Sequence, residues 1–125
     1  MIEFSVQLAN KPGQLATLAR ELGEAQVNVR SLAAITNGPD GLVKLVVDRD
    51  AEARGVLERA GLSFEEHRVI TATLKDKPGA LAEFAEALAN VGVNIEGIYL
   101  LNSEDDGLRF ALAVDDVEAA QPVTG

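Results

Sequence analysis

The chain has 125 residues, a formal charge of −9 and a composition that is 47% hydrophobic but only 4% aromatic, which predicts a core of Leu, Val, Ile and Ala. Its 11 lysines and arginines are scattered among 20 acidic residues, so we expect no nucleic-acid partner, and the lack of cysteine excludes disulfides, iron–sulfur clusters and thiol catalysis. The N-terminus does not resemble a signal peptide and no segment approaches the ~20 apolar residues of a membrane span, which predicts a soluble cytoplasmic protein without a membrane partner.

The first half of the chain predicts the order strand, helix, strand, strand, helix, strand. Residues 2–8 alternate apolar and polar side chains, which is typical of a strand with one buried face. From Gln14 the apolar residues recur at helical spacing and form a single stripe. We expect strands at 2–8, 29–35, 42–47 and 62–68, and helices from 14 to between 24 and 26 and at 51–60.

The second half restarts this order without a linker, so residues 62–75 are expected to form one long strand that serves both halves. A helix with the stripe Leu81, Phe84, Ala85 and Leu88 should follow, and then strands at about 93–103 and 107–114. At a constant offset of 66, Gly107 matches Gly41 and Pro122 falls at the place of Val56. We therefore expect the second unit to lack most of its second helix and all of its fourth strand. The sheet edge left open would be covered by the other unit or by a second chain; a truncated or frayed tail is the alternative.

An internal repeat carries the most specific signal. Residues 10–32 return without a gap as residues 76–98. The turn Lys-Pro-Gly recurs at 11–13 and 77–79, and the dipeptide Val-Asn recurs just before the next strand. Two polar points at fixed spacing indicate a pair of ligand-binding loops, because a repeat that served packing alone would not need them.

The element order predicts an α+β fold of two ferredoxin-like units, 1–68 and 69–125, each with helices on one face of an antiparallel sheet. The start of each unit's first helix presents unpaired amides and a positive dipole end, which suit a carboxylate. Gly13 and Gly79 would let a ligand approach the backbone. The carboxamides of Asn28 and Asn94 offer both a donor and an acceptor, as a zwitterionic ligand requires.

The run Asn-Lys-Pro-Gly-x-Leu, the helix stripe and the segments Val-Asn-Val and Val-Asn-Ile resemble the ACT domain, a regulatory module of amino-acid biosynthetic enzymes such as the serine-inhibited phosphoglycerate dehydrogenases. The resemblance covers nearly the whole chain as two copies, as in stand-alone tandem ACT proteins. It implies that a free amino acid binds at interfaces between units, contacted by the first loop and the start of the second strand. The implied ligand-binding residues are Asn10, Pro12, Gly13, Leu15 and Asn28 in the first unit, and Asp76, Pro78, Gly79, Leu81 and Asn94 in the second.

The second unit departs from this pattern at Asp76. An ionised carboxylate only accepts hydrogen bonds, so Asp76 could hold an ammonium group but would repel a carboxylate. The two sites are therefore expected to differ in ligand or in occupancy.

Structural roles compete with these assignments. Asn10 and Asp76 could be turn residues or helix caps, and the loop glycines could serve only the turn. Asn28 could simply tolerate a left-handed backbone. Leu15 and Leu81 are expected to be core residues first.

Outside the loops, the one histidine, His67, reads as a solvated strand residue, and the acidic run at 104–106 reads as a solvated loop. A catalytic or ligand role for His67 and a cation site at 104–106 are the less favoured alternatives, so we expect no catalytic residue, metal site or cofactor.

Three functions remain open. The first is a non-catalytic homodimeric sensor of a free amino acid, and the second is a structural dimerisation or protein-interaction module with no small ligand. The third is an enzyme on the same fold, such as an acyl-phosphate hydrolase. That chemistry would want an arginine in the first loop, where this chain has Lys11 and Lys77, so the sequence favours a protein that is not an enzyme.

Overall fold

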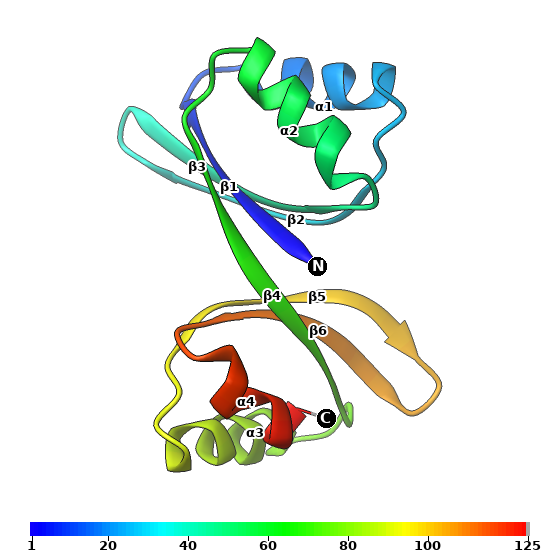
Figure 1. The fold of residues 1–125 in the computed structure, drawn as a ribbon, viewed down its shortest axis with the longest axis vertical. Helices are drawn as coiled ribbons and strands as arrows, with labels where there is room; N and C mark the ends of the chain where they lie inside the picture. Colours follow the sequence, from blue (N-terminus) through cyan, green and yellow to red (C-terminus); the bar gives the residue numbers. More distant parts are fainter. Residues whose placement is uncertain (125) are drawn as a thin grey trace. The chain divides into compact units, whose positions relative to one another are not determined.

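The computed structural model describes residues 1–124, which form two compact units (Figure 1). The first unit comprises Ile2–His67, and the second comprises residues 68–124 together with Met1. Both are α+β, and all of their strand pairs described below are antiparallel.

The first unit has the order expected of a ferredoxin-like fold. Its elements are β1 (Ile2–Ala9), α1 (Gln14–Glu24), β2 (Val29–Asn37), β3 (Asp40–Val47), α2 (Asp50–Arg59) and the start of β4 (Phe64–Leu74). The strands lie in the order β2-β3-β1-β4, and both helices cover one face of the sheet. The buried core between sheet and helices includes Phe4, Leu22, Leu45 and Leu57.

The second unit uses the rest of β4 and adds α3 (Ala80–Asn90), β5 (Ile95–Glu104), β6 (Gly107–Val114) and α4 (Val117–Thr124). Its strand order is β4-β6-β5, with β4 paired to β6 from Val69 to Leu74. Leu88 and Leu112 are fully buried at its core, and Phe84 packs against them from α3.

The expected alternation and helical spacing are confirmed for most elements, and β4 is the single long strand predicted for residues 62–75. The prediction that the second unit lacks most of its second helix is wrong, because α4 occupies Val117–Thr124 with Pro122 inside it. No fourth strand follows α4 among the described residues.

A β-bulge explains why Gly107 does not match Gly41. In β5 the register shifts between Leu100 and Asn102, whereas β2 has no corresponding shift. This adds one residue to β5, so the offset between the units changes from 66 to 67. Gly107 therefore begins β6 as Asp40 begins β3, and does not match Gly41. Ala53 in α2 and Ala120 in α4 are both buried and are 67 residues apart, so they follow the new offset.

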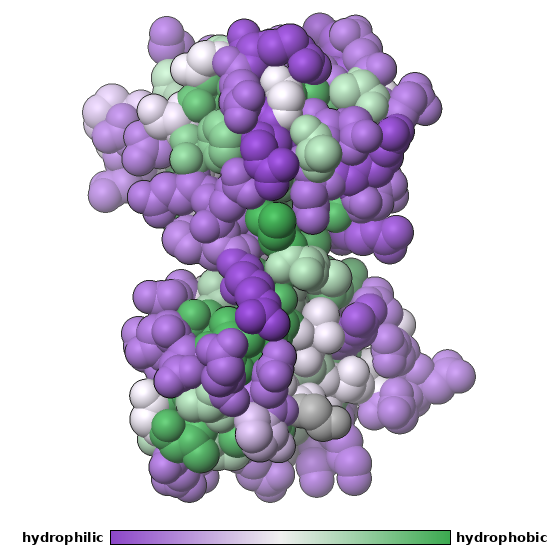
Figure 2. All heavy atoms as spheres, in the orientation of Figure 1, coloured by the Kyte–Doolittle hydropathy of each residue, from purple (hydrophilic) through white to green (hydrophobic). Residues whose placement is uncertain are grey.

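Figure 2 shows that hydrophilic residues cover most of the visible surface of each unit and that apolar residues gather in smaller patches. No helix within residues 1–124 is long and apolar enough to cross a membrane. The same residues contain no group of three or more acidic or histidine side chains arranged to hold a metal ion.

Candidate functional site

An aspartate that follows β3 fixes the entrance to β2. The amide of Asn28 donates to Oδ1 of Asp48 at 2.9 Å, and the amide of Asp48 donates back to the Asn28 carbonyl at 3.2 Å. The backbone of Asn28 is thus held on both sides. Its side chain is exposed and has no hydrogen-bond partner within residues 1–124. The Asn28 backbone is therefore fixed, and its carboxamide is free to bind a ligand.

The second unit repeats this arrangement. The amide of Asn94 donates to Oδ1 of Asp115 at 2.8 Å, and the amide of Asp115 donates to the Asn94 carbonyl at 3.2 Å. A β-bulge follows both asparagines, between Val29 and Ser31 and between Ile95 and Gly97. Bulges frequently redirect side chains beside functional sites. Sequence reasoning missed the two aspartates, because the bulge in β5 places them 67 rather than 66 residues apart.

The loop before the first helix has the same conformation in both units. Gly13 and Gly79 each cap their helix with φ of 88°, in the left-handed region, and neither helix has a side-chain cap. In the first unit, the amides of Leu15 and Ala16 have no acceptor within the described residues. Unpaired amides at the positive end of a helix dipole form a seat for an anion. This matches the predicted role of the loop glycines.

Asn10 has a structural role in the first unit. Its Nδ2 donates to the Gly38 carbonyl at 2.7 Å, and its amide donates to the Pro39 carbonyl at 2.9 Å, which ties the β1–α1 loop to the β2–β3 turn. Asp76 cannot donate in this way, and it lines a cavity with the acidic turn residues Glu104 and Asp105. The two loops therefore differ in charge and in the hydrogen bonds that tie them to the neighbouring turn.

Within one unit, the loop at Gly13 lies far from Asn28 at the entrance to β2. Ala9 pairs with Asp40 at one end of the sheet, and Val29 pairs with Val47 at the other. Gly13 begins the 11-residue helix α1, and Asn28 follows its end. Such a helix is about 16 Å long. A single unit therefore does not bring Gly13 and Asn28 to one small ligand.

All of the predicted site residues are exposed. The expectation that Leu15 and Leu81 are core residues is wrong, since their exposed fractions are 39% and 56%. Of the predicted stripes, Leu18 in α1 and Leu88 in α3 are buried in the core. Pro12 and Pro78 are exposed in the loops before the two helices, and Leu15 and Leu81 are exposed in the first helical turns, so each unit presents apolar surface next to the amide seat.

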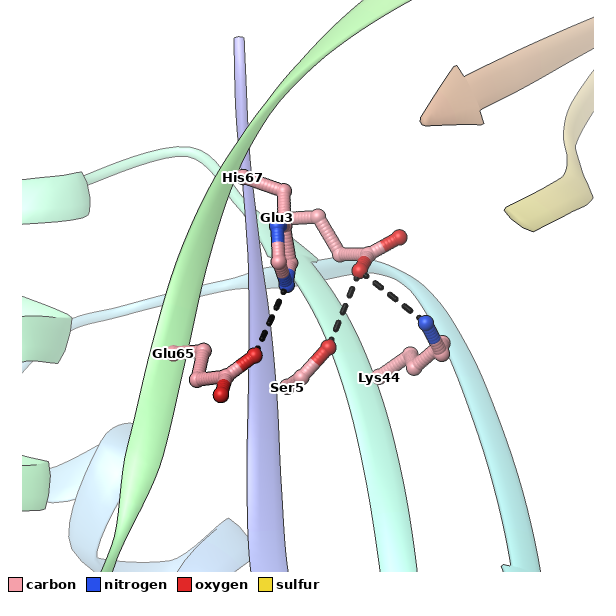
Figure 3. Close-up of polar contacts among 5 residues, drawn as sticks. All are labelled: Glu3, Ser5, Lys44, Glu65 and His67. Carbon is pink, nitrogen blue, oxygen red and sulfur yellow. Dashed lines mark hydrogen bonds and ion pairs between the residues drawn. The ribbon is translucent and has the colours of Figure 1, made fainter. Parts of the chain in front are cut away.

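The sheet face opposite the helices of the first unit carries a polar cluster that sequence reasoning did not find (Figure 3). Glu3 is fully buried although the alternation placed it on the solvated face. Its Oε1 accepts hydrogen bonds from Ser5 Oγ at 3.0 Å and Lys44 Nζ at 3.3 Å. Its Oε2 has no partner within residues 1–124. Lys44 supplies the charge compensation that a buried carboxylate needs.

On the same face, His67 projects from β4 and its Nε2 is 3.4 Å from a carboxylate oxygen of Glu65 (Figure 3). The imidazole is half-buried, whereas the Glu65 side chain is largely exposed. This histidine is therefore a strand residue with a carboxylate neighbour.

An ion pair joins α2 to β4 in the first unit. Arg54 donates from Nε to Glu66 Oε2 at 2.8 Å and from Nη2 to Oε1 at 2.6 Å. The guanidinium carbon also lies 5.9 Å from the centre of the Phe4 ring. The hydrogen bonds from Arg54 lower the pKa of Glu66, and the same bonds raise the pKa of Arg54. The pair fixes helix to strand and lies away from the loops.

Residues 68–124 match the ACT domain family. The matched segment coincides with the second unit, apart from Met1. Two curated relatives are the aspartokinases of Corynebacterium glutamicum, 26% identical over 129 residues, and Mycolicibacterium smegmatis, 26% identical over 136 residues. The alignments cover 90% and 95% of this chain. They span only 30% and 31% of the two enzymes, so the chain corresponds to under a third of each relative.

Solved structures share the fold. A Bacteroides thetaiotaomicron protein superimposes with a TM-score of 0.87 at 22% identity, covering 98% of this chain and 84% of that one. The regulatory subunit of aspartate kinase from Thermus thermophilus, in its ligand-free form, gives a TM-score of 0.72 at 20% identity, covering 98% and 87%. At such identities the likeness concerns the fold alone.

Proposed function

We propose that this protein is a non-catalytic sensor that binds a free amino acid between ACT-like units of two copies of the chain. The observation that carries the proposal is the conformation of the two loops, each with an uncapped helix start behind a left-handed glycine. The match of residues 68–124 to the ACT domain family supports it, and so does the alignment with aspartokinases, whose chains extend well beyond the matched part. We extend the ACT assignment to the first unit because both loops and both Asn–Asp pairs recur there.

In this proposal the ligand is held by two half-sites. The carboxylate of the amino acid accepts hydrogen bonds from the amides of Leu15 and Ala16, next to Gly13 and Pro12. Its ammonium group donates to the carboxamide oxygen of Asn28 from the other copy. The 11-residue helix between these half-sites explains why one unit alone is insufficient. The exposed Leu15 then contacts the ligand's side chain.

The second unit should bind differently. Gly79, Pro78, Leu81 and Asn94 keep their positions, but Asp76 and the acidic turn at 104–106 place negative charge beside the amide seat. Negative charge opposes a carboxylate there. We therefore propose that the first unit supplies the tighter site.

A ligand that bridges two copies stabilises the homodimer by mass action. The gain is about 2.7 kcal/mol when the free ligand is at 100 times its Kd. No cofactor, metal or catalytic residue enters this mechanism.

A thermal-shift screen of the purified protein against the twenty amino acids at millimolar concentration tests the proposal. We expect one amino acid to raise the melting temperature, and the shift to disappear in Asn28→Ala. Asn90→Ala is the matched control, because Asn90 is also exposed but lies at the end of α3. If no amino acid shifts a folded dimer, the protein is an interaction module and the sensor proposal is wrong.

A further inference from the structure

The outer edge of β4 in the second unit has no neighbouring strand over most of its length. On one side β4 pairs with β6 from Val69 to Leu74. On the other side the amide of Val69 donates to the Met1 carbonyl at 3.0 Å, and no strand within residues 1–124 lies beside Ile70–Leu74. Backbone amides and carbonyls alternate in direction along a strand, so those of Thr71 and Thr73 point to this edge, as the amide of Val69 does. The edge can therefore accept a further strand.

A cavity of about 360 Å³ lies where the side chains of such a strand would point. Leu74, Phe84, Ala87 and Val123 give it an apolar floor between β4, α3 and α4, and Thr73 lies at its border. A second cavity, of about 770 Å³, continues along the same edge past Thr71 to Met1. The unpaired edge and an apolar groove thus run together.

The first unit shows how the equivalent place is filled. Gln7, which corresponds to Thr73, donates its amide to the Ser63 carbonyl at 3.0 Å. On either side of Ser63, Leu62 and Phe64 pack against the core that includes Leu18 and Val56, the counterparts of Phe84 and Val123. The groove is therefore shaped for an extended segment with apolar side chains two residues apart.

Charge defines the flank of that segment. The protein carries a formal charge of −9, yet Lys75 and Lys77 line the first cavity beside Glu83, and Arg68 and Arg109 line the second, where Arg68 also lies 3.8 Å from a carboxylate oxygen of Glu118. An antiparallel segment seated as Leu62–Phe64 is in the first unit would extend towards the arginines. Acidic residues after the second apolar side chain would meet them. In the first unit the same segment continues as Glu65-Glu66.

We propose that this edge binds an extended segment of a partner protein, with two apolar side chains separated by one residue and followed by acidic residues. The segment adds to the sheet as a strand, so backbone hydrogen bonds to Thr71 and Thr73 give affinity and the groove gives specificity. This surface is distinct from the loops of the proposed amino-acid site.

A fluorescent peptide with the sequence of residues 61–67, Gly-Leu-Ser-Phe-Glu-Glu-His, is the probe. We expect saturable binding to the full chain by fluorescence anisotropy, and none for the peptide with Leu62→Ser and Phe64→Ser. Thr73→Pro removes the backbone amide that would donate to the bound segment, so it should abolish binding. The variant should still fold, because proline is tolerated at a strand edge. Circular dichroism checks that this variant folds.

Lys77→Glu is a second variant that keeps the backbone intact, and it should weaken binding roughly tenfold. Its matched control is Lys11→Glu, because Lys11 holds the same loop position in the unit whose groove is filled; it should bind as the wild type does. Absence of binding to the wild type, or binding that neither Thr73→Pro nor Lys77→Glu weakens, overturns the proposal. So does a wild-type dimer that excludes the peptide and that Thr73→Pro converts to monomer, because a second copy would then cover the edge.

Discussion

The amide of Asn28 donates to the carboxylate of Asp48 at 2.9 Å, and this contact helps to fix the start of β2 while leaving the asparagine side chain exposed. The equivalent bond from Asn94 to Asp115 has almost the same length, 2.8 Å. In both units, therefore, the aspartate holds the backbone of the asparagine, and the asparagine carboxamide stays exposed to solvent and ligands.

Asp48→Ala should lower the free energy of unfolding by about 1 to 2 kcal/mol, because the Asn28 amide loses a charged acceptor. Urea denaturation followed by circular dichroism measures the change. Asp40→Ala is the control, since Asp40 is also an exposed aspartate in β3 with no side-chain hydrogen bond within the described residues. Equal stability of Asp48→Ala and the wild type would show that the contact does not hold β2.

Asn28→Ala should behave differently from Asn10→Ala. The Asn28 side chain has no partner within residues 1–124, so its removal should change the free energy of unfolding by less than about 0.5 kcal/mol. Asn10→Ala loses the 2.7 Å bond to Gly38 and should cost about 1 kcal/mol. Denaturation of both variants, beside the amino-acid thermal-shift assay, separates a ligand contact from a loop clamp. A large loss of stability in Asn28→Ala would make that asparagine structural.

Much of the fold could be predicted because local patterns determine it. The alternation in residues 2–8 and the stripe after Gln14 mark β1 and α1, and the gapless repeat transfers both elements to the second unit. The extra residue in β5 could not be seen in this way. It lies after the gapless repeat ends, and a bulge changes register without a distinctive residue type. The error at Gly107 has this cause, whereas the error at Pro122 arose because a proline was expected to prevent the helix that α4 forms around it.

The candidate site was predictable only in part. The loop glycines and the two asparagines were identified by their recurrence, and the structure places all of them at the surface. Leu15 was misjudged because helical spacing identifies a stripe but does not show which of its members the rest of the fold covers. The buried Glu3 was missed because alternation assigns a face and not the burial of that face.

Gly107→Ala should lower the free energy of unfolding by about 2 kcal/mol or more, since an added Cβ would collide with the Leu74 carbonyl of the paired strand. Gly41→Ala is the comparison, because there the nearest atom, the Leu8 carbonyl oxygen, would be 3.2 Å away and the cost should be about 1 kcal/mol or less. Denaturant midpoints of the two variants give the order. A milder effect at Gly107 than at Gly41 would contradict the pairing of β4 with β6.

The ion pair between Arg54 and Glu66 should make stability depend on pH in a defined direction. The hydrogen bonds from Arg54 lower the pKa of Glu66 in the folded chain. A carboxylate whose pKa is depressed by folding contributes stability that is fully present above its unfolded pKa of about 4.3 and is lost as pH falls through the lower folded value. Arg54→Met should therefore lower the melting temperature at neutral pH and have a diminishing effect towards about pH 3. Glu65→Gln, a change at the adjacent exposed carboxylate, is the control for altered net charge. An Arg54→Met effect that persists undiminished at low pH would instead assign the role of Arg54 to its packing over Phe4.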